Sequence, residues 1–135
     1  MPKILIIGLG NIGFYHLLSL HNSIKKYEIY LCDSDKNVYK KILDHKINFK
    51  DYFLKIDKIN SFKFDLVIFA TTANDRYKLL NHLLNYNKCK YIIFEKVAFN
   101  NNIEMNKALK KIKSYKIKSW VNCNYQIIPF FIELK

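Results

Sequence analysis

Short apolar runs alternate along the chain with longer stretches in which apolar residues recur at three- and four-residue spacing. The runs predict buried strands, because strands covered on both faces are almost continuously apolar. These runs are Ile4–Ile7, Glu28–Cys32, Asp65–Ala70, Tyr91–Phe94 and Lys118–Asn122, with a further short strand at 47–53. Helices are predicted near 14–20, 37–45 and 102–115 and, after a polar loop at 71–75, up to Asn85, whereas 55–64 fits a turn or a short helix. The alternation predicts an α/β fold, a doubly wound parallel sheet of about six strands with helices on both faces.

Each predicted helix has an apolar face that we expect to contact the sheet. These faces consist of Phe14, Leu17, Leu18 and Leu20; Val38, Ile42 and Leu43; Tyr77, Leu80, Leu83 and Leu84; and Met105, Ala108, Leu109 and Ile112. Asn87 follows the third helix. We expect it to form a left-handed C-cap, because asparagine adopts that conformation where glycine is absent.

The chain has only three glycines, and all three lie in one turn. Gly8, Gly10 and Gly13 form a G-x-G-x-x-G motif directly after the first apolar run. In this motif the first glycine allows a tight turn, the second lets the main chain approach a pyrophosphate, and the third lets the helix pack on the strand. The helix N-terminus then directs N–H groups at the phosphates. The motif predicts that Gly8, Gly10, Asn11, Ile12 and Gly13 hold the pyrophosphate of a dinucleotide.

An acidic residue completes this pattern. Asp33 directly follows the second predicted strand, at the distance of about 20 residues at which such proteins place a ribose-binding carboxylate. A carboxylate accepts hydrogen bonds from a 2′-hydroxyl and repels a 2′-phosphate. The sequence therefore favours NAD over NADP as the cofactor, although Lys36 lies close enough in sequence to weaken the preference.

Polar segments follow the other predicted strands as well. Ligands bind to parallel sheets beyond the carboxyl ends of the strands. The segments at these ends are Gly8–Gly13, Asp33, Thr71–Asn74, Glu95–Lys96 and Asn122–Gln126. We expect Thr71, Thr72 and Asn74 to line the nicotinamide side of the site.

Composition excludes several classes of protein. The formal charge is +12, yet Arg76 is the only arginine, whereas nucleic-acid readers favour arginine forks, so we expect no nucleic-acid partner. No apolar run approaches the ~18 residues of a membrane span, and no signal peptide precedes the glycine motif. Cys32, Cys89 and Cys123 are isolated and lack metal-ligand spacing. We expect a cytoplasmic protein with reduced, mostly buried thiols, no metal and no membrane contact.

The order of these motifs resembles the N-terminal domain of the Gfo/Idh/MocA family, named for glucose–fructose oxidoreductase, inositol dehydrogenase and rhizopine catabolism. The resemblance covers essentially the whole chain. It rests on the glycine motif, Asp33, the run Asp65–Thr71, the dipeptide Glu95-Lys96, and the segment Asn124-Tyr125-Gln126 followed by Pro129. The Glu-Lys dipeptide at a strand end is its most specific element.

The resemblance implies an NAD-dependent oxidoreductase that acts on a hydroxyl of a sugar, cyclitol or nucleotide sugar. It implies that Glu95 and Lys96 flank the nicotinamide and the substrate, with Lys96 as the catalytic residue. It also implies a Rossmann domain at 1–122 and, at 123–135, the start of a connecting helix toward a second domain that supplies most of the substrate pocket. We expect an oligomer, formed through that domain or through the apolar segment 127–134.

The chain also differs from the family pattern, and other functions remain open. Val97 and Thr72 stand where proline is usual, Arg76 where histidine is frequent, and Gln126 where arginine is common. The four histidines, at positions 16, 21, 45 and 82, are not placed to replace the second domain's catalytic groups. The alternative function is a non-catalytic NAD(H)-binding or redox-sensing module.

Overall fold

The computed structural model describes residues 1–123 of the 135-residue chain. The elements are β1 (Lys3–Ile7), α1 (Asn11–His21), β2 (Glu28–Cys32), α2 (Lys36–Asp44), β3 (Asp51–Phe53), the 3₁₀ turn η1 (Ile56–Lys58), β4 (Lys63–Phe69), α3 (Arg76–Tyr86), β5 (Lys88–Glu95), α4 (Asn102–Ser114) and β6 (Lys118–Asn122). The family-like segment 124–126, the apolar segment 127–134 and nearly all of the expected connecting helix lie outside the described residues.

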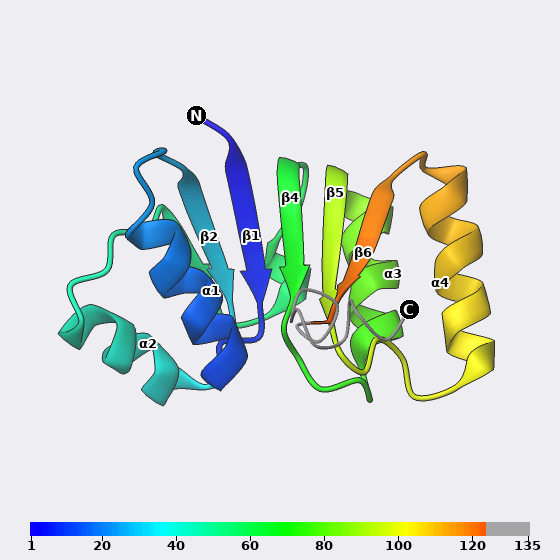
Figure 1. Ribbon diagram of the computed structural model, residues 1–135, viewed down its shortest axis with the longest axis horizontal. Helices are drawn as coiled ribbons and strands as arrows, with labels where there is room; N and C mark the ends of the chain where they lie inside the picture. Colours follow the sequence, from blue (N-terminus) through cyan, green and yellow to red (C-terminus); the bar gives the residue numbers. More distant parts are fainter. Residues whose placement is uncertain (124–135) are drawn as a thin grey trace, which may run out of the picture.

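The strands form one six-stranded sheet in the order β3-β2-β1-β4-β5-β6 (Figure 1). Every neighbouring pair of strands is parallel, and the arrowheads of the labelled strands in Figure 1 point toward one edge. From β1 the strands are added on one side as β2 and β3, and then on the other side as β4, β5 and β6. Such a reversal, here between β1 and β4, opens the crevice in which parallel sheets bind ligands. The predicted doubly wound α/β fold is confirmed.

The register places the strand ends at one level. Ile7 at the end of β1 pairs with Cys32 of β2 and with Phe69 of β4, and Phe69 also pairs with Phe94 of β5. The residues that follow these strand positions are Gly8, Asp33, Ala70 and Glu95. Segments far apart in the sequence are thereby aligned along one edge of the sheet.

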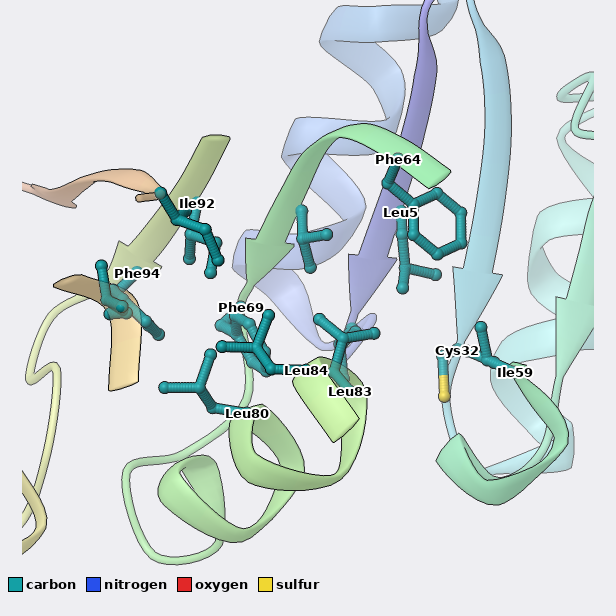
Figure 2. Packing of buried hydrophobic residues seen from close by; sticks show 14 of the residues in the cluster. Leu5, Cys32, Ile59, Phe64, Phe69, Leu80, Leu83, Leu84, Ile92 and Phe94 are labelled. Carbon is teal, nitrogen blue, oxygen red and sulfur yellow. The ribbon is translucent and has the colours of Figure 1, made fainter. Parts of the chain in front are cut away.

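Alternate side chains of each strand pack on opposite faces. Ile4 and Ile6 of β1 pack with Phe14 and Leu17 of α1, together with Ile42 of α2. On the other face, Leu5, Phe64, Phe69 and Phe94 pack with Leu80, Leu83 and Leu84 of α3 (Figure 2) and with Ala108 and Ile112 of α4. Both faces of the sheet therefore carry a packed core that fixes the strand ends.

Asn87 does not adopt the left-handed conformation that we expected. Its φ of −136° and ψ of 164° are extended, and the residue is buried. The side-chain Nδ2 donates to the carbonyls of Ile59 (2.7 Å) and Leu83 (3.2 Å), and Oδ1 accepts from Phe62 N–H (3.0 Å). The amide ends α3 by satisfying buried main-chain groups, which an extended residue can do as well as a left-handed one.

Three predicted core residues are exposed instead. Leu43 of α2 and Met105 and Leu109 of α4 have exposed fractions of 49%, 39% and 51%. The fully buried residues of these two helices are Ile42, Ala108 and Ile112. α2 and α4 lie toward the two ends of the sheet, where a helix has less to pack against, so the buried stripe is narrower than the apolar pattern implied.

Candidate functional site

Two of the three glycines are required by the fold itself. Gly8 has a φ of +87°, and a Cβ there would lie 2.7 Å from the amide nitrogen of Thr71. A Cβ on Gly13 would lie 1.9 Å from the carbonyl oxygen of Gly8, so α1 packs onto the turn only because this residue has no side chain. The roles that the motif predicted for the first and third glycines are confirmed.

Gly10 differs from the other two. A Cβ at Gly10 would have no heavy atom within 4 Å, and its φ of −59° is open to any residue. Gly10 is also the N-cap of α1, and no side chain caps this helix start. Exposed main-chain N–H groups and open space at a helix N-terminus fit an anion such as a pyrophosphate. Asn11 and Ile12 begin the same helix and are exposed.

The Asp33 carboxylate holds the glycine turn in place. Oδ2 accepts from the main-chain N–H of Leu9 at 2.6 Å, and Oδ1 accepts from that of Asp35 at 2.8 Å. A carboxylate has about four acceptor positions, so sites remain for the hydroxyls of a ribose. The nearby Asp33 charge also adds to burial in raising the pKa of the Tyr52 hydroxyl, which donates to the Asp35 carbonyl. No local pattern in the sequence indicates that Asp33 would also bind the turn.

An open cavity of about 590 Å³ lies beside this carboxylate. Four predicted site residues line it, namely Gly8, Asp33, Thr71 and Thr72. Other lining residues were not predicted, among them Leu54 and Ile56 before and within η1 and Lys78 and His82 on α3. The stretch 55–64 carried no clear pattern, so only the fold shows that part of it faces the cavity.

A second cluster forms where β5 and β6 end. His16 Nε2 of α1 lies 2.6 Å from Glu95 Oε1, and Asn122 Nδ2 donates to the same oxygen at 2.7 Å. Glu95 is buried, whereas Lys96 after it is exposed. His16 was not among the predicted site residues, yet it follows Gly13 by about one helical turn and so lies on the same face of α1. That spacing was the available signal.

Arg76 is the largest buried polar side chain near the site. Its exposed fraction is 1%, and its guanidinium donates to main-chain carbonyls in the loop after β4, at the last residue of β5 and in the loop after β5. Burial lowers the pKa of Arg76, and the charge of Glu95 opposes that effect. The sequence marked this position only as a departure from the family pattern.

The structure does not bring all the predicted site residues to one cavity. Asn74 is exposed, and its Oδ1 accepts from Asn100 Nδ2 at 2.5 Å. Glu95 and Lys96 lie along the same sheet edge but do not line the 590 Å³ cavity. The site therefore has two parts, a cavity between β1, β2 and β4 and a polar cluster at the ends of β5 and β6.

The described part of the chain lacks the features of a metal site, a membrane-spanning helix or a thiol nucleophile. Residues 1–123 contain no group of three metal-ligating side chains, and none of their helices is long and apolar enough to cross a membrane. Burial raises the pKa of Cys32 to about 12, with Asp33 adding to the effect, so its thiol stays protonated. Cys32 is therefore not a nucleophile at neutral pH.

No family model matches the chain, and no protein of curated function matches it in sequence. Solved structures do. The WlbA dehydrogenase from Chromobacterium violaceum, in complex with NADH and UDP-GlcNAcA, superposes with a TM-score of 0.81 and 15% identity over 99% of this chain and 38% of that one. Myo-inositol 2-dehydrogenase from Lactobacillus plantarum gives 0.74 and 18%, over 99% and 42%. An oxidoreductase from Agrobacterium radiobacter, in complex with NAD⁺, L-tartaric acid and magnesium, gives 0.76 and 18%, over 98% and 40%.

The chain thus spans about two fifths of the length of these structures. At such low identities the similarity establishes the fold. The shared fold is a Rossmann fold similar to that of these dehydrogenases, as the sequence resemblance to Gfo/Idh/MocA-type dehydrogenases predicted.

Proposed function

We propose that this chain is the NAD-binding domain of an oxidoreductase that transfers a hydride between the nicotinamide cofactor and a hydroxyl of a sugar, cyclitol or nucleotide sugar. The observation that carries the proposal is the open Gly10 position at an uncapped helix start, one residue from the Leu9 N–H that binds Asp33. The fold itself needs no glycine there, but a pyrophosphate does.

Different residues would bind different parts of the cofactor. The N–H groups of Gly10, Asn11, Ile12 and Gly13 would bind the pyrophosphate, helped by the positive end of the α1 dipole. Asp33 would accept hydrogen bonds from the adenosine ribose, with the adenine against Leu54 and Ile56 in the 590 Å³ cavity. Thr71 Oγ1 is buried and has no hydrogen-bond partner among the described residues, so it has capacity for a cofactor group.

The β5 end would serve the reacting end of the cofactor. When bound, the nicotinamide accepts or donates the hydride. Glu95 is held by His16 and Asn122, which fixes the main chain that carries Lys96. Lys96 would polarise a substrate carbonyl or hold the hydroxyl for proton transfer. This chain covers only 38–42% of the length of these two structural neighbours, which supports a larger protein. In it, a second domain after about residue 122 would complete the substrate pocket.

Calorimetric titration with NADH and NADPH tests the proposal. We expect NADH to bind more tightly, because the Asp33 carboxylate repels a 2′-phosphate. If NADPH bound tenfold more tightly, a difference of about 1.4 kcal/mol, the role of Asp33 would be wrong. If neither dinucleotide bound, the proposed function itself would be wrong.

A further inference from the structure

Arg76 connects the two halves of the candidate site. It begins α3, in which position an arginine would ordinarily reach solvent, yet its side chain is almost fully buried. The guanidinium points back toward the strand ends. Nη2 donates to the carbonyl of Thr71, and Nη1 donates to carbonyls of Glu95, Val97 (2.5 Å) and Ala98 (3.1 Å).

These four acceptors belong to two different chain segments. The Thr71 carbonyl lies in the loop after β4, which contributes Thr71 and Thr72 to the cavity. The other three lie at the end of β5 or in the loop after it, and two of them, Glu95 and Val97, lie on either side of Lys96. One planar group with fixed donor directions therefore sets the main chain around Lys96 relative to the cavity.

The charge of Arg76 is stabilised in an unusual way. Its hydrogen bonds in the described residues go to main-chain carbonyls and not to a carboxylate. An apolar side chain would fill the same space without the cost of burying a charge. Lysine could not replace it, because an ammonium is a point charge and lacks the fork that spans two loops. A merely space-filling role does not explain these contacts.

Glu95 is held from both sides. Its carbonyl accepts from Arg76, while its carboxylate contacts His16 and Asn122. α1, α3, β5 and β6 thus converge on one residue directly before Lys96. Of these contacts, only those of Arg76 reach the far side of Lys96, at Val97 and Ala98.

We propose that Arg76 is the positioning residue of the nicotinamide end of the site: it aligns the loop that carries Lys96 with the loop that carries Thr71. This inference rests on the proposed NAD-binding function. It predicts that Arg76 matters for the part of the cofactor that contacts Lys96 and the Thr71 loop. It should not matter for the adenosine part, which Asp33 and the side of the cavity lined by Leu54 and Ile56 would bind.

The experiment compares two ligands that differ only in the nicotinamide. NADH contains it and ADP-ribose lacks it, so the ratio of their affinities isolates the nicotinamide end. In Arg76→Met we expect NADH affinity to fall about tenfold while ADP-ribose affinity stays within twofold. Arg76→Lys should not restore NADH binding. Lys110→Met, an exposed lysine of α4, is the matched control and should leave both affinities unchanged.

The outcomes separate the two proposals. If the wild-type protein binds neither ligand, the proposed function fails. If it binds both and Arg76→Met lowers both equally, or neither, Arg76 is only structural and the inference is overturned.

A measurement on the wild-type protein decides the matter if the variants do not fold. Guanidinium NMR signals of Arg76 should be protected from exchange and should shift on addition of NADH but not of ADP-ribose. Equal shifts with both ligands, or none, would contradict the proposal.

Discussion

The substitution Gly10→Val separates cofactor binding from folding at a single position. A Cβ there has no heavy atom within 4 Å, and the φ of −59° lies outside the left-handed region that favours glycine. The cost to the fold is the replacement of glycine by a poorer N-cap residue, which is at most about 1 kcal/mol. For a domain of this size that corresponds to a fall in melting temperature of roughly 3–6 °C.

The cost to cofactor binding is larger. A valine side chain would occupy the space in which the pyrophosphate approaches the start of α1. Each main-chain hydrogen bond to a charged group contributes about 1.5–3 kcal/mol. Loss of two such bonds would weaken NADH binding by at least about 100-fold, which is ~2.8 kcal/mol. Gly10→Ala should show a smaller loss, because its side chain is shorter.

The fluorescence of a single tryptophan can report NADH binding. Its single tryptophan, Trp120 of β6, lies two residues before Asn122, which contacts Glu95. Tryptophan emission overlaps the absorption of the reduced nicotinamide, so NADH bound nearby should quench Trp120. Calorimetry gives the affinity independently, and circular dichroism gives the melting temperature.

Ser19→Val is the matched control for this substitution. Ser19 is exposed on α1, about 13 Å further along the helix axis. This variant should bind NADH as the wild type does. A folded Gly10→Val protein with unchanged NADH affinity would refute the assignment of the pyrophosphate site to the glycine turn.

Three further predictions follow from other parts of the structure. Gly13→Ala should lower the melting temperature far more than Gly10→Ala does, because its Cβ would lie 1.9 Å from Gly8 O; equal melting temperatures in thermal unfolding would contradict the packing described. Hydrogen bonds from Lys90 and from the Lys3 N–H lower the pKa of Asp65, so Asp65→Asn should be less stable than the wild type at neutral pH. This difference in stability should vanish as the pH falls below the unfolded-state pKa of about 3.9 and through the lower folded-state pKa. A difference that persists in urea titrations at about pH 2 would exclude this cause. The purified 135-residue chain should bind NADH without catalysing sugar oxidation, since Lys96 by itself cannot align a substrate carbon with the nicotinamide; steady NADH formation from NAD⁺ and a sugar would disprove this.

The sequence by itself determined the fold and the position of the glycine turn. Its apolar runs and helical spacing required buried parallel strands, and parallel strands place their carboxyl ends at one edge. The three glycines required a tight turn, and the structure confirms this with the positive φ of Gly8 and the contact at Gly13. These features are local, because each depends on residues adjacent in the chain or one helical turn apart.

The tertiary structure decided the contacts between distant segments. Asn87 was assigned from its position after a helix, yet its side chain bonds to Ile59 and Phe62, which no local pattern reveals. His16 and Glu95 are 79 positions apart and meet only because the parallel sheet brings the first turns of α1 and the end of β5 to the same edge. The groups that accept from Arg76 are main-chain carbonyls, which every residue has. The sequence therefore contains no pattern from which this contact can be predicted. Side-chain periodicity specifies which elements form, whereas main-chain acceptors become specific partners only after packing has fixed the distances between loops.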